Sequence, residues 1–263
     1  MPLAVPSPTY VYLDLDLPVF SDRRVRQALL LAVDRDAMIQ QVLGGEAEKT
    51  DSFLPPGCWA YEPTLGRYDY DPEVASLLLD EAGWRLTAAG VRSREGSELT
   101  FHLETNSDPL RIATAERLVE AWQAVGVRVT VDAMAATTLV REVLEPRTYE
   151  AALFSAGGEA DPDPFLLWHS SQSSGKGLNL SSLDDARFDE LILEAREETS
   201  EVRRQELYGE LQELFAQEVP AIPLYAETLL YVHEESLRGT RLGYTPDAGA
   251  RFWQVQEWFL KTR

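Results

Sequence analysis

A segment of about 35 residues in the middle of the chain constrains the fold more than any other feature. Residues 99–103 alternate between apolar and polar side chains, which indicates a strand with one buried face. Asp108 and Pro109 then begin a helix with one apolar face. Gly126 ends that helix, and valines alternate again over 127–131. Strand, helix and strand at this spacing predict a βαβ unit with parallel strands and a right-handed connection.

The alternation of strands and helices extends on both sides of this unit. Residues 10–15 alternate as a strand, and a helix over 137–145 and a strand over 149–154 are expected after the unit. Two long helices follow, before a strand-like tail from Ile222 onward. Their apolar faces are formed by Phe188, Leu191, Ile192 and Ala195, and by Leu207, Leu211, Leu214 and Phe215. The order predicts an α/β fold with a mixed, partly parallel sheet flanked by helices.

The stretch from Tyr68 to Trp84, YDYDPEVASLLLDEAGW, predicts a short helix with sharp ends. Asp71 suits the N-cap and is followed by proline, while Gly83 suits the left-handed residue that ends a helix. Trp84 is expected to fold back onto Leu79. The residues expected to share the buried face are Val74, Leu77, Leu78 and Ala82.

A pair of helices is predicted before it, in FSDRRVRQALLLAVDRDAMIQQVLGG. Ser21 is expected to cap the first helix and Asp34 the second, which Gly44 and Gly45 end. The expected buried stripe of the first helix consists of Val25, Ala28, Leu29, Ala32 and Val33.

These two signatures together resemble a known family. The patterns are F-x-D-x-x-V-R-Q-A-L…A-x-D-R and Y-x-Y-D-P-x-x-A-x-x-L-L-x-x-A-G-W. They are similar to those of the solute-binding proteins of peptide, dipeptide and nickel ABC importers, and further family-like blocks follow in family order as far as Tyr231. The resemblance implies a periplasmic-binding-protein-like (type II) lobe. It also implies a non-enzymatic protein that encloses a peptide or peptide-like solute between two lobes and delivers it to an ABC permease.

The resemblance also implies a domain organisation. Family members are roughly twice this length, and the matching motifs belong to their second half, so we expect a C-terminal portion whose N-terminal lobe is missing. Residues 1–17 would form an N-terminal strand and inter-lobe segment, 18–235 the solute-binding lobe, and 236–263 a segment that packs on the missing lobe. The complete protein is expected to be a monomer outside the cytoplasm, periplasmic or anchored as a lipoprotein, although the first residues lack a signal-peptide pattern.

Candidate ligand-binding residues follow from the geometry of α/β sheets, in which ligands bind beyond the carboxyl ends of the strands. That rule selects Glu104 and Asn106 after the first strand of the βαβ unit. It also selects the loop after the strand at 149–154, with Ser155, Gly157, Gly158, Glu159 and Asp161.

The second loop departs from the pattern of the peptide-binding members. In those members a carboxylate in this loop can pair with the α-amino group of the ligand, and alignment on the shared D-P-D places that position on or beside Gly158. Either Glu159 replaces it with a longer side chain, or the ligand lacks a free α-amine. Asp161 and Asp163 also suit a turn and a helix start, so a structural role for them stays open.

Composition excludes several classes of protein. The 24 basic and 44 acidic residues give a net charge of −20, which disfavours nucleic acid as a partner. The single cysteine and three widely spaced histidines show no metal-ligand spacing, and no cofactor motif or catalytic signature occurs. No apolar run is long enough to span a membrane. The alternative to a transport protein is the ligand-sensing domain of a cytoplasmic transcriptional regulator.

Overall fold

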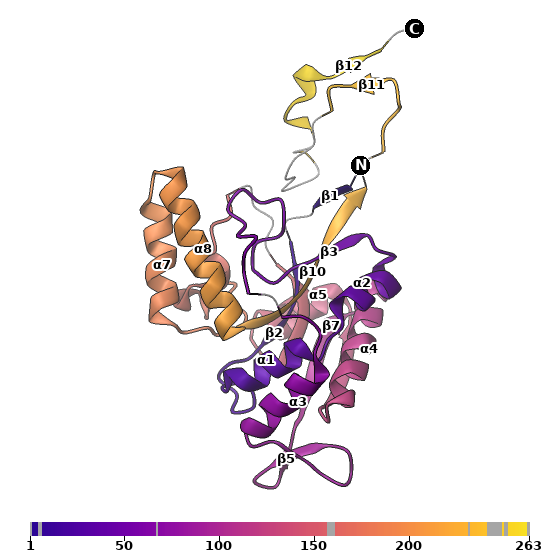
Figure 1. The fold of residues 1–263 in the computed structure, drawn as a ribbon, viewed down its shortest axis with the longest axis vertical. Helices are drawn as coiled ribbons and strands as arrows, with labels where there is room; N and C mark the ends of the chain where they lie inside the picture. Colours follow the sequence, from indigo (N-terminus) through magenta and orange to yellow (C-terminus); the bar gives the residue numbers. More distant parts are fainter. Residues whose placement is uncertain are drawn as a thin grey trace.

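The computed structural model is a three-layer structure with one mixed sheet between two layers of helices (Figure 1). It describes residues 2–4, 7–66, 68–156, 161–230, 232–240, 249 and 252–261. The strand order in the main sheet is β1-β10-β2-β9-β7-β8, with β3 paired to β10. The strands are β1 (Pro2–Ala4), β2 (Thr9–Leu13), β3 (Ala47–Lys49), β7 (Thr100–Asn106), β8 (Arg128–Met134), β9 (Ala151–Ser155) and β10 (Ala221–Leu230).

The predicted βαβ unit is confirmed. β7 pairs with β8 in parallel along its whole length, from Thr100 opposite Arg128 to Asn106 opposite Met134. β7 is also parallel to β9, whereas β2 runs antiparallel to both β9 and β10. The sheet is therefore mixed and partly parallel, as the alternation of elements predicts.

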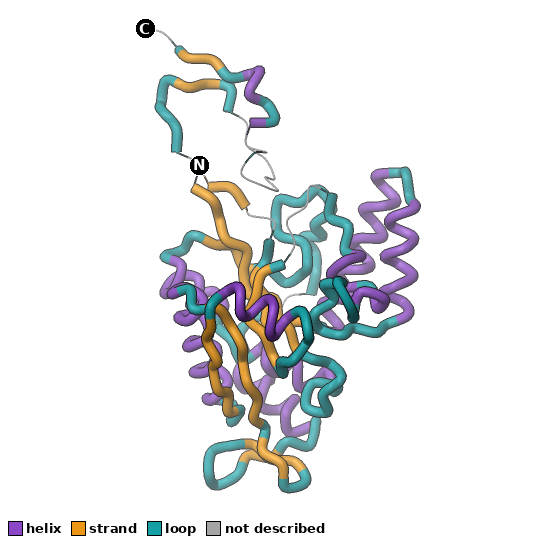
Figure 2. The backbone as a smooth tube through the Cα atoms, turned by 180° about the vertical axis from the view of Figure 1, so that it is seen from behind, coloured by secondary structure: helices purple, strands orange, loops and turns teal. Residues whose placement is uncertain are grey.

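Helices cover both faces of the sheet, as Figure 2 shows from behind. One face carries α1 (Arg23–Leu31), α2 (Arg35–Leu43), α3 (Pro72–Glu81) and α4 (Pro109–Ala124). The other carries α5 (Ala136–Thr138), the π-helical turn η1 (Leu139–Leu144), α6 (Phe165–Trp168), α7 (Ala186–Glu197) and α8 (Glu201–Glu218). Because side chains of a strand alternate, β2 sends Val11 and Leu13 into the first core and Tyr10 and Tyr12 into the second.

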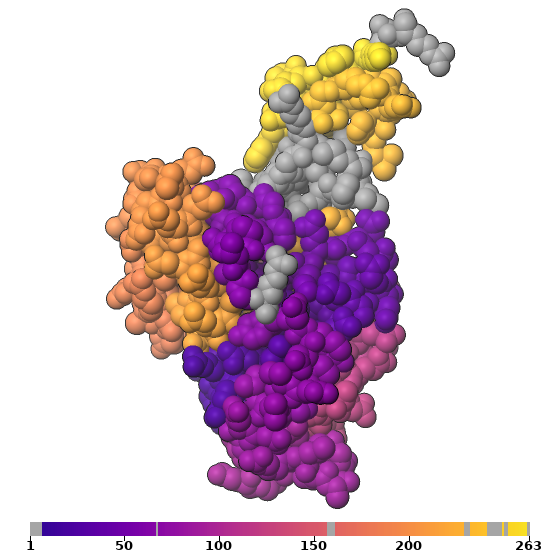
Figure 3. Space-filling model, viewed as in Figure 1, coloured from indigo at the N-terminus to yellow at the C-terminus, as the bar shows by residue number. Residues whose placement is uncertain are grey.

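Two smaller sheets lie outside this body. β4 (Arg85–Leu86), β5 (Arg92–Arg94) and β6 (Ser97–Glu98) form a sheet at one end of the molecule (Figure 1). β11 (Leu237–Arg238) pairs with β12 (Phe259–Leu260) at the other end, and the segment between them includes the turn η4 (Val255–Glu257). In the space-filling view the described part of this C-terminal region projects beyond the body (Figure 3).

The ends of α3 agree with the sequence, but its predicted buried face is wrong for two of the four residues, Val74 and Leu77. The Asp71 carboxylate accepts a hydrogen bond from the Val74 amide at 2.9 Å, and Gly83 adopts a φ of +87°. However, Val74 and Leu77 are 40% and 60% exposed. The side chains that are buried are Ala75, Leu79 and Ala82, with Leu78 partly buried against the same core. α3 packs against α1, and the small Ala75 side chain allows a close approach, so the contact follows the i, i+4 row through Ala75 and Leu79.

The cap of α1 also differs from the prediction by one residue. Asp22, not Ser21, accepts the hydrogen bond from the Arg24 amide. The Ser21 hydroxyl instead donates to the Pro18 carbonyl oxygen at 3.1 Å. The predicted stripe of α1 is confirmed, because all five of its residues are buried.

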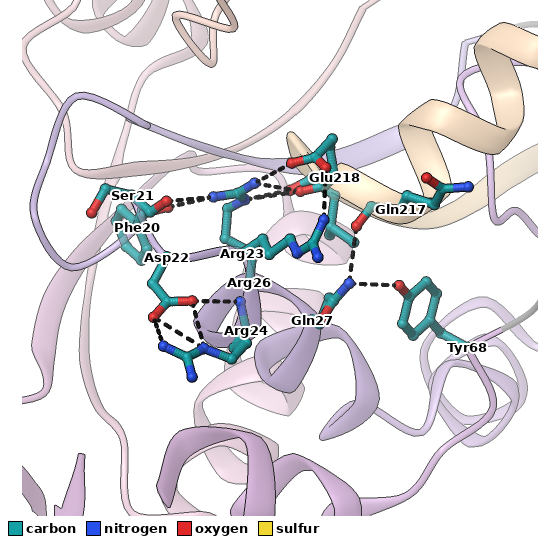
Figure 4. A network of polar contacts seen from close by, with 11 residues as sticks. Phe20, Ser21, Asp22, Arg23, Arg24, Arg26, Gln27, Tyr68, Gln217 and Glu218 are labelled. Carbon is teal, nitrogen blue, oxygen red and sulfur yellow. Dashed lines mark hydrogen bonds and ion pairs between the residues drawn. The ribbon is translucent and has the colours of Figure 1, made fainter. Parts of the chain in front are cut away.

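The polar residues of the first signature tie distant parts of the chain together (Figure 4). The buried Arg26 guanidinium donates to the carbonyl oxygens of Phe20, at 2.8 Å, and of Val219, at 3.0 Å. Gln27 donates to the Gln217 carbonyl oxygen at 2.9 Å. These bonds fix the end of α8 against α1, so this part of the signature serves the fold.

Candidate functional site

The candidate site lies at the end of the main sheet where β7 and β9 finish. Because the two strands are parallel, their last residues, Asn106 and Ser155, reach the same edge of the sheet. β2 begins here, since Thr9 lies opposite both Ser155 and Tyr225 of β10. Four segments that are far apart in the sequence therefore meet at this edge.

An arginine from α4 joins these segments. Arg111 donates to the Thr9 hydroxyl at 2.7 Å and to the Ser155 hydroxyl at 2.6 Å, and its guanidinium lies 3.5 Å from the Glu227 carboxylate. The Thr9 and Ser155 hydroxyls are also bonded to each other at 2.9 Å. Thr9 is fully buried and the Arg111 side chain is 14% exposed, so this part of the cluster is shielded from water, whereas the Glu227 side chain is 44% exposed. It fixes the start of the loop after β9 relative to β2 and β10.

The N-terminus of α4 is fixed at the same edge. Asp108 caps the helix by accepting hydrogen bonds from the Leu110 and Arg111 amides, at 2.9 and 3.3 Å. The Asn106 side-chain oxygen accepts from the Asp108 amide at 3.0 Å, which holds the turn between β7 and α4. This local geometry places Arg111 one turn after the cap, facing the sheet.

Glu104 lies two residues before Asn106 on the strand, on the face opposite Ser155. This assignment follows from alternation, because Leu103 and Leu153 belong to the first core. The Glu104 carboxyl is half-buried, and its Oε2 has no hydrogen-bond partner among the described residues. Burial raises the pKa of Glu104 to about 7, and the nearby charge of Asp132 acts in the same direction.

His102 and two carboxylates surround Glu104. The His102 Nδ1 lies 2.6 Å from the Asp132 carboxylate, and its backbone amide donates to Glu150 at 2.6 Å. The hydrogen bond to Asp132 raises the pKa of His102 above its ordinary value. In the described parts of the chain, no group of three or more His, Cys, Asp or Glu side chains is placed to hold a metal ion.

The structure places Asp161 and Asp163 in ion pairs with helices. Asp161 accepts a hydrogen bond from Arg204 of α8 at 2.6 Å. Asp163 accepts from the Phe165 amide at 3.0 Å and pairs with Arg196 at 3.0 Å. Asp163 therefore has the structural role at a helix start that the sequence suggests. Asp161 is paired with Arg204.

The remaining predicted residues, Gly157, Gly158 and Glu159, lie outside the described residues. The structure brings Asn106 and Ser155 to one edge of the sheet, but by alternation Asn106 and Glu104 both lie on the face opposite Ser155, and Asp161 is bonded to α8. Sequence reasoning missed Arg111, Thr9 and Glu227. A signal was present only for Arg111, one turn after a strong N-cap at the end of a strand.

The architecture defines the class of protein. One mixed sheet between two helical layers, with loops at the carboxyl edge of its parallel strands, matches solved periplasmic binding proteins. The structure of AppA from Bacillus subtilis in complex with a nonapeptide aligns with a TM-score of 0.84 and 26% identity, over 100% of this chain and 52% of that one. NikZ from Campylobacter jejuni in complex with Ni(L-His) aligns with a TM-score of 0.84 and 26% identity, over 99% and 53%.

Sequence comparison identifies the family. The model for bacterial extracellular solute-binding proteins, family 5, middle region, matches residues 4–177, so the chain belongs to this family. The oligopeptide-binding protein AppA of Bacillus subtilis is 27% identical over 261 residues, which are 96% of this chain and 47% of the relative. A dipeptide-binding protein of Pseudomonas aeruginosa is 26% identical over 237 residues, 89% and 43% of the two chains.

The chain spans about half the length of the curated relatives it matches. The family is one of solute-binding proteins, in agreement with the prediction that the chain is not an enzyme. Within the described residues, no helix has the length and apolar character needed to cross a membrane.

Proposed function

We propose that this chain forms a solute-binding lobe of an ABC importer and takes up a peptide or a peptide-like small solute. The observation that carries the proposal is the convergence of Asn106, Ser155 and Thr9 at the carboxyl edge of β7 and β9. The relatives' names add support, because AppA and the Pseudomonas aeruginosa protein are described as oligopeptide- and dipeptide-binding. The permease subunits of the importer are the proposed partners, and the proposed location is outside the cytoplasm.

The domain organisation belongs to the same proposal. Residues 18–235 would form the lobe, with 1–17 and 236–263 as the segments that connect to and pack on an opposite lobe. Supporting this, β1 pairs with the end of β10, and the two strands extend together away from the body (Figure 1). A solute held between two lobes would bind weakly to one of them, because half of the enclosing surface would be absent.

The proposed ligand-contacting residues are those at the edge of the sheet. Asn106 and the loop from Ser155 to Asp161, which contains Gly157, Gly158 and Glu159, would present polar groups to the backbone of the solute. Glu104 would contribute from the face of β7 opposite Ser155. The Arg111 cluster supports this role, since it fixes the start of the loop before any ligand binds.

The test is calorimetry on the complete polypeptide that the gene encodes, with peptides of two to nine residues and with the same peptides N-acetylated. We expect binding with a dissociation constant in the micromolar range or below for at least one length. A loss of affinity on acetylation would indicate a carboxylate partner such as Glu159, and equal affinities would indicate a solute without an anchored amine. Absence of binding to every peptide would refute the proposed solute class.

A further inference from the structure

An apolar cavity lies beside the candidate site, on the helical face opposite the Arg111 cluster. Its volume is about 530 Å³. It is bounded by η1, the end of β9 and the loop at 175–180. The apolar lining consists of Val140, Leu144, Phe154, Ala156, Leu178 and Leu180. The charged lining residues among those described are Glu145 and Lys176, one of each sign.

The wall opposite β9 is held in place by the protein itself. Arg147 donates to two backbone carbonyl oxygens of the loop, those of Asn179 at 2.6 Å and Gly177 at 3.0 Å, and to that of Gln172, just before the loop, at 3.1 Å. Gly177 is required where the loop turns back, because a Cβ there would lie 2.1 Å from the Gln172 carbonyl oxygen. The wall is therefore formed without a ligand, as in most small-molecule sites.

The position of the cavity connects it to the proposed solute site. Phe154 and Ala156 lie on either side of Ser155 at the end of β9, and both side chains face the η1 layer. The loop that begins at Ser155 is the one proposed to contact the solute. Val140 and Leu144 come from η1, and π-helical turns occur frequently at functional sites.

We propose that this cavity is a side-chain subsite, which takes a large apolar or aromatic side chain of a bound peptide. The inference rests on the proposed function and adds to it the class of side chain that is preferred. The volume falls within the roughly 300–1,000 Å³ of ligand pockets. Six apolar side chains form most of the lining, so burial in the cavity favours an apolar side chain over a polar one, which would exchange water mainly for apolar contacts. Because Glu145 and Lys176 have opposite charges, the lining favours neither an acidic nor a basic side chain of the ligand.

The experiment measures calorimetric affinities of the complete gene product for three tripeptide series. In each series one position of trialanine is replaced by Phe, Glu or Lys. We expect Phe to bind at least tenfold more tightly than Ala, Glu or Lys at one position. In Ala156→Leu, which fills the cavity, we expect that preference to fall at least tenfold. Ala133→Leu is the matched control, because Ala133 is an exposed alanine on β8 that does not line the cavity.

A second variant and a second probe keep the two proposals separable. Leu178→Ser changes a lining side chain that is 43% exposed, so we expect the same loss of Phe preference with an unchanged melting temperature. Binding of free indole, followed by saturation-transfer NMR, tests the cavity without a peptide. If indole binds and Ala156→Leu abolishes that binding while no peptide binds, the cavity binds an aromatic group, but the proposed function fails and with it the role of the cavity as a peptide subsite. If peptides bind without a Phe preference, or Ala156→Leu weakens all peptides equally, the subsite is refuted.

Discussion

Replacing Glu104 with glutamine should remove a pH-dependent loss of stability. The carboxyl sits on β7 between β8 and β9, and burial and the Asp132 charge disfavour its ionised form. Its pKa rises from 4.5 to about 7 in the folded protein. Between these two values the folded protein keeps a proton that the unfolded chain has released. The free energy of unfolding therefore falls as the pH rises from about 4.5 to 7, and then levels off.

The size of the effect follows from the difference between the two pKa values. For a fully buried group, a pKa of 4.5 in the unfolded chain and of about 7 in the folded protein would lower the free energy of unfolding by about 3 kcal/mol at high pH. Because Glu104 is only half-buried, solvent screening reduces the expected effect to about 1–2 kcal/mol. Glu104→Gln should therefore match the parent near pH 5 and exceed its stability by about 1–2 kcal/mol at pH 8.

The assay is urea unfolding followed by circular dichroism at pH 5, 6, 7 and 8 and constant ionic strength. His102 needs its own control, because its raised pKa also gives a stabilisation that is lost as the pH rises through the folded value. The His102→Gln variant, alone and combined with Glu104→Gln, separates the two contributions. A stability difference between Glu104→Gln and parent that is the same at pH 5 and pH 8 would refute the reasoning.

Three further substitutions test the packing and the candidate site, the first two by urea unfolding and the third by thermal unfolding and ligand binding. Arg111→Gln should cost about 1–3 kcal/mol because it removes two charge-assisted hydrogen bonds to the part-buried hydroxyls of Thr9 and Ser155, whereas Arg117→Gln, in an exposed ion pair, should cost less than about 0.5 kcal/mol; equal losses would contradict the role of the Arg111 cluster. Leu79→Ala should cost about 2–5 kcal/mol and Leu77→Ala less than about 0.5 kcal/mol, and the reverse order would restore the face of α3 predicted from the sequence. Gly177→Ala should lower the melting temperature and reduce apolar-ligand binding, since the added methyl meets a backbone oxygen; an unchanged protein would show that the loop is not fixed.

Local signals account for most of what the sequence predicts correctly. Asp34, Asp71 and Asp108 cap helices as expected because an N-cap depends on residues two or three positions away. The alternation at 99–103 identifies the buried face of β7, since period two leaves only two choices. A helix gives more choices, and α3 shows the consequence: a stripe centred on Val74 and Leu78 and one centred on Ala75 and Leu79 are nearly equivalent by hydrophobicity alone.

The sequence likewise predicts only part of the candidate site. The rule that ligands bind beyond the carboxyl ends of strands selects Asn106 and Ser155 from the sequence, and the fold brings them to one edge. It does not select Arg111, whose partners Thr9 and Ser155 are 102 and 44 positions away in the chain. The pairing of Asp161 with Arg204 is equally distant, at 43 positions.

The sequence by itself therefore determines the α/β class, the element order and the family, because these depend on periodicity, capping and motif order along the chain. Tertiary structure alone decides which polar groups already have partners and where an apolar space remains. Arg26 is satisfied by the end of α8 and Asp161 by Arg204, and the loop that forms one wall of the cavity between η1 and β9 accepts hydrogen bonds from Arg147. Such contacts join residues that no local pattern relates, so the chemistry available to a solute is a property of the folded protein.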